Sequence, residues 1–397
     1  MIAAALAGLA LRLAFSLGYW VDRPLTRDEQ EYLSLARSLA GGHGFVYDAT
    51  LAATDTFGRA PGYPAFLALV GGGGAQTSSV PAPVKIAQSI VGALAIPLVA
   101  VIAARLAGPA AGAAAAAIAA IYPPLAWISA YALSEVLFLP LGLLTALLVD
   151  EALARRKGDA GVAFAAGLAG GVAVLVRPGM VFFFLLAAVV LLVRRRAGVV
   201  VALAIGSLLV VLPWMLRNQT REGRFTIATE GGITFWTGNH PLAVGDGDMA
   251  ANPAIKVDRI ALRARHPGLT EAQMEPIYYR EALTWMREHP LDWLALEARK
   301  AFYLVVPAGP SYRVHSTLYV TASIVSYGLV LALAIGGLRR LGGRWSQATG
   351  LWLLAGSAVL GSLVFFPQER FRIPVIDPTL IVLAGVAVAG WRARLSA

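Results

Sequence analysis

Two adjacent carboxylates, Asp28 and Glu29, are the first residues of the chain whose types and spacing could do chemistry. They lie near the start of segment 26–45, in which apolar residues recur at the spacing of one face of an amphipathic helix. Thr26 and Glu29 form a predicted capping box, so a structural role for Glu29 stands beside a catalytic one. Asp28 falls on the apolar face, where a carboxylate is costly unless a site uses it, although the helix dipole alone also favours acids in a first turn. The opposite, solvated face is predicted to hold Gln30, Ser34, Arg37 and Ser38.

Three further charged residues lie near the ends of apolar runs. Arg59 precedes a turn-forming Ala-Pro-Gly-Tyr-Pro stretch that holds its guanidinium in place for an anion, and a plain surface arginine is the alternative. Tyr63, in the same stretch, is a candidate for substrate binding. Glu135 follows Ser134 at the start of an apolar run, where it is either a site residue or an acid favoured by the helix dipole. Arg177 interrupts two apolar runs, so it should bind a carboxylate such as Glu135 or a phosphate.

Five more residues are candidates for substrate binding on weaker grounds. Arg217 lies just beyond an apolar run that ends in Pro-Trp. Asn239 and His240 lie in a turn-rich loop and could contact sugar hydroxyls, although His240 alone is typical of an ordinary loop histidine because no metal-ligand spacing surrounds it. Arg370 and Arg372 flank an aromatic residue between the last two apolar runs, which suits a lipid phosphate, with a simple interfacial anchor as the alternative.

Other chemistries lack their minimum parts. The chain has no Gly-x4-Gly-Lys-Ser/Thr, His-Glu-x-x-His or Gly-x-Ser-x-Gly motif, which excludes P-loop nucleotide hydrolysis, zinc proteolysis and serine hydrolysis of those types. It has no cysteine, which excludes disulfides and thiolate metal sites. Asp246 and Asp248 could hold a divalent cation, but they are short of further ligands and favour a turn.

The charged candidates lie in or between long apolar segments, which the composition of the chain explains. Of the 397 residues, 58% are hydrophobic and 14% are charged, and the mean hydropathy of +0.67 implies more apolar surface than a soluble core of this length buries. We therefore expect an all-α polytopic membrane protein, with a single domain over residues 1–397 and about ten spans. The expected spans are residues 1–20, 85–104, 108–127, 131–149, 160–176, 178–193, 198–216, 316–338, 346–366 and 373–391.

The basic residues of the short loops predict the orientation. They gather on one side of the expected spans, which the positive-inside rule makes cytoplasmic, together with both termini. The outer side then receives the two long segments 21–84 and 217–315. The net charge of +10 belongs to this bias, so nucleic acid is not an expected partner. Segment 1–20 carries Arg12 and lacks a basic start, so we expect a retained span rather than a cleaved signal peptide. The inner basic residues are Arg105, Arg155, Arg156, Lys157, Arg194, Arg195, Arg196, Arg339, Arg340, Arg344, Arg392 and Arg394.

These motifs together resemble those of the GT-C membrane glycosyltransferases. The pattern Asp-Glu-x-x-Tyr-x-x-x-Ala from Asp28, followed by the stretch that begins at Arg59, is most similar to the protein O-mannosyltransferase and aminoarabinose-transferase branch. The resemblance implies that Asp28 is the catalytic base and that Arg59 and Arg177 bind the donor's phosphate. It further implies that Glu135 is a second acid, which orients the acceptor or these arginines. Gly62 departs from the Pro or Leu that is more usual in this stretch.

The resemblance implies a polyprenyl-phosphate sugar as donor and a lipid, glycan or protein as acceptor, at the outer face of the plasma membrane. Direct displacement at the anomeric carbon inverts its configuration and needs one base, while a phosphate leaving group needs cations and no general acid. A glycosidase would need two opposed carboxyl groups. A transporter or lipid flippase is the first alternative, disfavoured because the sequence has no inverted repeat. A noncatalytic subunit of a glycan assembly complex is the second, and the sequence leaves it open.

Overall fold

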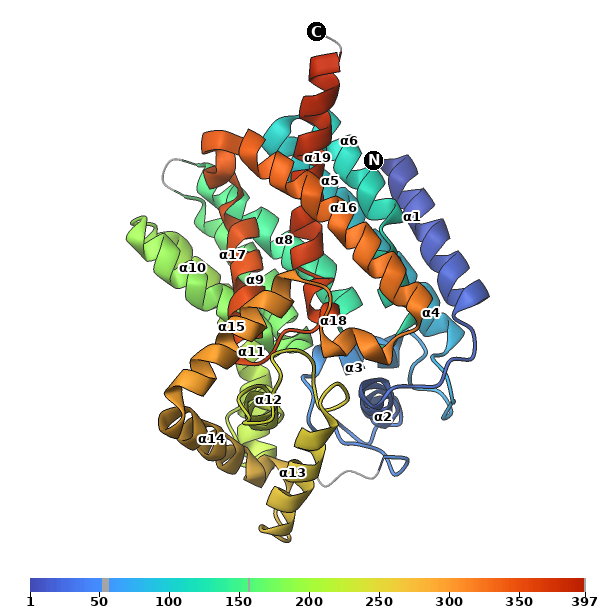
Figure 1. The fold of residues 1–397 in the computed structure, drawn as a ribbon, viewed down its shortest axis with the longest axis vertical. Coiled ribbons are helices and arrows are strands. Elements are labelled where there is room, and N and C mark those ends of the chain that lie inside the picture. Colours follow the sequence, from blue (N-terminus) through green and yellow to red (C-terminus); the bar gives the residue numbers. More distant parts are fainter. Residues whose placement is uncertain (52–56, 156–157, 396–397) are drawn as a thin grey trace.

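The computed structural model describes residues 1–51, 57–155 and 158–395, and every regular element in these ranges is a helix (Figure 1). The bundle consists of α1 (Ile2–Ala14) with the π-helical turn η1 (Phe15–Tyr19), α4 (Ala82–Ala93), α5 (Ala95–Ala107), α6 (Pro109–Ile121), α8 (Glu135–Ala154), α9 (Ala160–Val176), α10 (Val181–Val193), α11 (Ala197–Glu222), α16 (Thr317–Leu341), α17 (Thr349–Val364) and α19 (Ile376–Leu395). Short connectors within it are α7 (Pro123–Trp127), η2 (Ile128–Ala130), η3 (Pro178–Met180), η5 (Gly342–Ala348) and α18 (Glu369–Arg372).

The remaining helices belong to the two long segments predicted to lie outside the membrane. The first contains α2 (Arg27–Ala40) and α3 (Gly62–Leu69), and the second contains α12 (Gly231–Gly238), α13 (Pro253–Ala264), α14 (Glu271–Glu288), α15 (Pro290–Val305) and η4 (Pro310–Val314). Apolar side chains of α12, α13 and α14 form a small core of their own, which includes the buried Trp236, Leu262 and Tyr278. These helices therefore fold as a packed cap rather than as an extended loop.

The apolar segments coincide with helices as the hydropathy predicts. Each of the ten expected spans overlaps one bundle helix or a consecutive pair. Within the described ranges, five helical segments are long and apolar enough to cross a membrane, or six if Pro109–Ile121 and Pro123–Ala130, bent by 61°, form one span. Three shorter apolar helices cover Ala160–Val176, Pro178–Val193 and Ile376–Trp391. The chain is thus a multi-pass helical membrane protein, and the number of ten spans remains a prediction.

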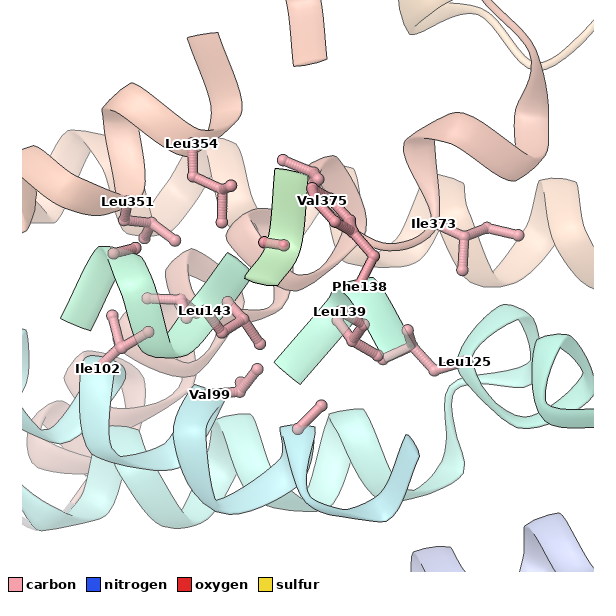
Figure 2. Close-up of a cluster of buried hydrophobic side chains, with 14 of the residues drawn as sticks. Val99, Ile102, Leu125, Phe138, Leu139, Leu143, Leu351, Leu354, Ile373 and Val375 are labelled. Carbon is pink, nitrogen blue, oxygen red and sulfur yellow. The ribbon is translucent and has the colours of Figure 1, made fainter. Parts of the chain in front are cut away.

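The interior of the bundle is filled with aliphatic side chains, because each helix that passes through it is apolar on more than one face. Helix α8 lies between α5 and α17, and Figure 2 shows their facing side chains. These are Val99 and Ile102 from α5, Leu139 and Leu143 from α8, and Leu351 and Leu354 from α17.

Helices α9 and α11 approach each other closely through small residues. A Cβ atom on Gly167 would lie 2.3 Å from the carbonyl oxygen of Leu203, and one on Gly206 would lie 2.3 Å from that of Phe164. Glycine at both positions lets the two backbones meet, which is a common way of packing helices in a membrane.

The predicted capping box at the start of α2 is confirmed. The Thr26 hydroxyl accepts a hydrogen bond from the Glu29 N–H, and Glu29 Oε2 accepts one from the Thr26 N–H at 2.8 Å. The predicted solvated face is wrong for Ser34 and Ser38, which are buried. The chain that follows α2 folds back over this face, where the Ser34 hydroxyl donates to Asp48 at 3.0 Å.

The two ends of the bundle differ in composition. Both termini lie at the end away from α2 and from the cap helices (Figure 1). Inner basic residues of different loops meet neighbouring elements at this end, where Arg105 pairs with Glu151 at 2.7 Å and Arg344 donates to the Leu106 carbonyl at 2.9 Å. Arg156 and Lys157 lie outside the described residues. The predicted inner and outer groups of residues are therefore at opposite ends of the bundle.

Candidate active site

A cavity of about 520 Å³ lies at the end of the bundle that carries α2 and the cap. Its wall is built from the first long segment, the start of α8, the turn between α9 and α10, the start of the second long segment, and the junction of α17 with α19. Segments far apart in the sequence thus meet around one space. Five of the predicted site residues line it, namely Asp28, Arg59, Glu135, Arg177 and Arg370.

Asp28 is held between two arginines. Arg59 Nη2 donates to Asp28 Oδ1 at 2.6 Å, and Arg370 Nη1 donates to Asp28 Oδ2. Burial alone would raise the pKa of the Asp28 carboxyl, but the two guanidinium groups outweigh it and hold this pKa well below its usual range. Asp28 is therefore an ionised acceptor with both oxygens occupied.

Arg59 lies among three carboxylates, which the sequence did not predict. Besides Asp28, its Nη2 lies 2.7 Å from Glu31 Oε2 and its Nε lies 3.1 Å from Glu230 Oε1. Its guanidinium carbon is also 5.1 Å from the centre of the Tyr32 ring. The positive charge of Arg59 is thus used to hold neighbouring acids together, since each of these pairs is charge-assisted.

Arg177 pairs with Glu135, one of the two partners that the sequence predicts. The Arg177 Nη1 atom lies 2.6 Å from Glu135 Oε1, and the same nitrogen donates to the Ser134 hydroxyl at 3.3 Å. Helix α8 begins at Glu135 and α9 ends just before Arg177, so the pair joins two bundle helices at the cavity. Glu135 is almost fully buried, and Arg177 is the more exposed partner.

Two arginines of the cavity share one aromatic ring. The guanidinium carbon of Arg177 is 5.0 Å from the centre of the Phe371 ring, and that of Arg370 is 5.1 Å from it. Both distances are typical of cation–π contact. Arg370 and Phe371 belong to the single turn α18, which interrupts the chain between α17 and α19. The break in the helices therefore brings two cations to the same side of the cavity.

Two predicted residues of the first long segment are buried away from the cavity wall. Glu29 caps α2 with Oε2 and accepts a hydrogen bond from the Ala132 N–H with Oε1 at 2.9 Å, which supports the structural alternative. Tyr63 is fully buried, and its hydroxyl donates to Gln88. Both side chains connect α2 and α3 to the bundle, since their partners lie on other elements.

Four other predicted residues also lie outside the cavity wall. Arg217 bonds to Asn218 at 3.0 Å within α11, and Asn239 accepts from Lys300 Nζ at 3.0 Å. His240 is buried, with Nε2 3.5 Å from Asp258 Oδ2. Arg372, only two residues after Arg370, pairs with the buried Asp377 at 2.8 Å inside the bundle. The roles of these four as substrate contacts remain predictions, and the structure gives each a protein partner.

Glu230 and Glu275 are the acids of the cavity wall that sequence reasoning missed, and Glu230 is the one that pairs with Arg59. It lies at the start of α12 in the second long segment, and its side chain is 32% exposed, more than that of Asp28 at 19%. Burial raises the pKa of Glu230 to about 7, with Glu31 and Asp28 adding to the rise and Arg59 opposing it. The one local signal is an acid directly before the pair Gly231 and Gly232, which is too common a pattern to mark a site.

The divalent-cation candidate at Asp246 forms a turn. Asp246 Oδ2 accepts a hydrogen bond from the Ser311 N–H at 2.7 Å, and the side chain packs against Gly309. Among the residues that the structure describes, no group of three or more His, Cys, Asp or Glu side chains is placed to hold a metal ion.

The chain is thus a multi-pass helical membrane protein with a charged cavity at one end of its bundle. Comparisons with known proteins show which of them share this fold. Neither a family model nor a curated protein sequence matches the chain. It is similar to the archaeal oligosaccharyltransferase AglB from Archaeoglobus fulgidus in complex with an inhibitory peptide and a dolichol-phosphate, with 15% identity, a TM-score of 0.55 and coverage of 99% of this chain and 50% of that chain. A structure of the Archaeoglobus fulgidus oligosaccharyltransferase in complex with Zn and sulfate gives 14% identity, a TM-score of 0.52 and coverage of 99% and 49%.

ArnT from Cupriavidus metallidurans bound to undecaprenyl phosphate is also similar, with 16% identity, a TM-score of 0.43 and coverage of 98% of this chain and 77% of that chain. At these identities the likeness concerns the fold alone, which this chain shares with the oligosaccharyltransferase structures. The chain spans about half the length of the oligosaccharyltransferase that it matches.

Proposed function

We propose that the chain is an inverting glycosyltransferase that moves a sugar from a polyprenyl-phosphate donor to a lipid, glycan or protein acceptor at the outer face of the plasma membrane. The observation that carries the proposal is the cavity at the end of the apolar bundle, in which Asp28 pairs with Arg370 and Arg177 lines the same wall. Cations beside an ionised carboxylate supply the two requirements of this displacement. The motifs favour the branch of protein O-mannosyltransferases and aminoarabinose transferases.

The donor's phosphate binds between Arg177 and Arg370 in this proposal. Both guanidinium groups contact Phe371, and Arg370 belongs to the break between two bundle helices, where a prenyl chain in the bilayer can present its phosphate. The sequence favoured Arg59 for this contact. Arg59 already has three carboxylate partners, so we give it the role of holding Asp28 and assign the phosphate to Arg370.

Asp28 acts as the base. The acceptor oxygen forms a bond to the anomeric carbon, and the bond from that carbon to the phosphate oxygen breaks with its electron pair going to the phosphate. The acceptor proton goes to Asp28. When the phosphate engages Arg370, Asp28 loses one of its two cations, which raises its affinity for a proton at the time when it must accept one.

The donor is tested with purified protein and a panel of polyprenyl monophosphate sugars. Mass spectrometry should detect bound sugar lipid and, when the acceptor is present, released polyprenyl phosphate. The member of the panel that binds and is consumed identifies the sugar. If no sugar lipid binds, the transport and noncatalytic-subunit alternatives replace the proposal.

The base is tested with Asp28→Asn. We expect transfer to be lost, by about 100-fold or more, because the amide cannot accept the proton. The fold should persist, since Arg59 keeps Glu31 and Glu230 as partners and the Thr26 cap is untouched. Transfer at the wild-type rate by Asp28→Asn, in protein that is inserted and folded normally, would exclude Asp28 as the base.

A further inference from the structure

Asp28 is poorly suited to keep the proton that the proposed transfer releases. Both of its oxygens face guanidinium groups, and its pKa lies well below the usual range for an aspartate. Even when the donor's phosphate draws Arg370 away, Arg59 stays, because Glu31 and Glu230 also hold it in place. A proton on Asp28 therefore has to move on to another group before the next turnover.

Glu230 is the carboxyl group placed to receive it. Arg59 touches Asp28 with Nη2 and Glu230 with Nε, so one guanidinium group separates the two carboxyls. Both line the same cavity. Glu230 Oε1 faces Arg59 Nε at 3.1 Å.

The position of Glu230 is built into the contact between the two long segments. The Thr229 N–H donates to the Gly58 carbonyl at 3.0 Å, and the Thr229 hydroxyl donates to the Phe57 carbonyl at 2.7 Å. Gly58 leaves the space that Glu230 needs, because a Cβ atom there would lie 2.6 Å from Glu230 Oε1. Two hydrogen bonds and a glycine thus hold this acid against Arg59, although it is distant in the sequence.

The charged groups that face Glu230 set it apart from Asp28. Among the described residues, Arg59 is the cation that pairs directly with Glu230, and Arg370 lies farther off, while Glu31 and Asp28 repel its negative charge. Burial raises the pKa of Glu230 to about 7, whereas Asp28 stays ionised far below neutral pH. Two neighbouring carboxyls whose pKa values are pushed apart in this way are a common arrangement for passing a proton.

We propose that Glu230 is the proton acceptor that follows Asp28, taking the proton of the acceptor hydroxyl from Asp28 and releasing it to the outer solution. The inference rests on the proposed glycosyl transfer. The proton moves from the acceptor oxygen to the Asp28 carboxylate, then through water in the shared cavity to the Glu230 carboxylate, and then to the outer solution. Asp28 and Glu230 are both ionised again at the end of each cycle. Glu230 acts through Asp28, from which it takes the proton, and does not itself contact the sugar.

The pH profile of transfer tests the proposal. Below about pH 7 Glu230 is protonated and cannot accept, so the wild-type transfer rate should rise with pH and level off above that value. Glu230→Gln should lower the rate at neutral pH by about 10-fold to 100-fold and remove this rise, with the KM for the donor unchanged. Glu230→Asp keeps a carboxyl and should restore part of the rise. Glu281→Gln, which changes an exposed acid of α14 outside the cavity wall, is the matched control and should keep the wild-type shape of the profile.

A second measurement is independent of transfer. The infrared difference between the wild type and Glu230→Gln isolates one carboxyl group, and its protonated band should disappear as the pH is raised through about 7. In Asp28→Asn this band should disappear at a lower pH, because the Asp28 charge that helps to raise the pKa of Glu230 is gone. A wild type without this band overturns the inference, whether or not the protein transfers sugar. A Glu230→Gln variant that keeps the wild-type pH profile, whatever its absolute transfer rate, also overturns the inference. Failure of the wild type to bind any sugar lipid counts instead against the proposed function.

Discussion

Single side chains in the cavity differ chiefly in which partners they hold. Arg59 is surrounded by Asp28, Glu31 and Glu230. Among the described residues, Arg370 pairs closely with Asp28 and more distantly, at 3.9 Å, with Asp248. Arg177 has Glu135 as its partner and keeps Phe371 beside it. An arriving phosphate competes most easily for a cation with few anionic partners. The number of carboxylate partners therefore distinguishes Arg59, which holds the site together, from Arg370 and Arg177, which are free to bind a substrate phosphate in the proposed function.

This difference predicts the order of effects among arginine variants. We expect Arg370→Ala and Arg177→Ala each to lower the transfer rate by about 100-fold to 1,000-fold, because each removes a cation from the developing phosphate charge. Rates under single turnover and binding of the sugar lipid measure the effect. Arg287→Ala is the control, since Arg287 is exposed on α14 and lies outside the cavity wall. Equal lipid binding and equal rates in all three variants would contradict the phosphate site.

Most of the arrangement at the scale of elements could be predicted. The helical segments follow from hydropathy and from capping residues such as Thr26, because both are local properties of the chain. The burial of Ser34 and Ser38 was not predicted, because it depends on where the loop after α2 returns. The close contact of α9 with α11 likewise depends on two glycines that are unremarkable in an apolar sequence.

The contact of α9 with α11 can be tested by adding a single methyl group. Gly206→Ala should destabilise the protein by about 1–3 kcal/mol, because the new Cβ would overlap the Phe164 carbonyl and the helices would have to move apart. Thermal unfolding in detergent measures this loss. Gly328→Ala in α16 is the matched control, because a Cβ there has no atom within 4 Å. Equal unfolding temperatures for the two variants would show that the α9 and α11 backbones are not in close contact.

The charged cavity lies at the end of the molecule that carries α2 and the cap. Figure 1 shows both termini at the opposite end, where Arg105 and Arg344 of the inner loops contact neighbouring elements. The positive-inside rule predicts that the arginine end faces the cytoplasm. A donor carried by the outer leaflet requires the cavity to lie at the outer face. The proposed function would therefore be wrong if the orientation were reversed.

Orientation can be measured directly, because the chain has no cysteine of its own. In intact cells, a thiol reagent that cannot cross the membrane should modify Lys256→Cys in α13 and leave Arg155→Cys unmodified, since both side chains are exposed but lie at opposite ends. Both variants should react after solubilisation in detergent, which serves as the control. Labelling of Arg155→Cys alone would reverse the orientation and place the cavity inside.

The sequence by itself determined the class of the protein and several members of its site. Apolar length, loop charge and capping are read along the chain, and they predicted a helical membrane protein with Asp28, Arg59, Glu135, Arg177 and Arg370 as candidates, all of which line one cavity.

Only the tertiary structure decided how the charges pair. Arg370 and Arg372 belong to one turn, yet the first faces Asp28 in the cavity and the second pairs with Asp377 inside the bundle. Glu230 pairs with Arg59 although the two residues are far apart in the sequence, so no local spacing of residues could predict the pair. Charges at such separations meet because the packing of apolar helices brings their ends together, and a linear pattern of residues does not contain that geometry.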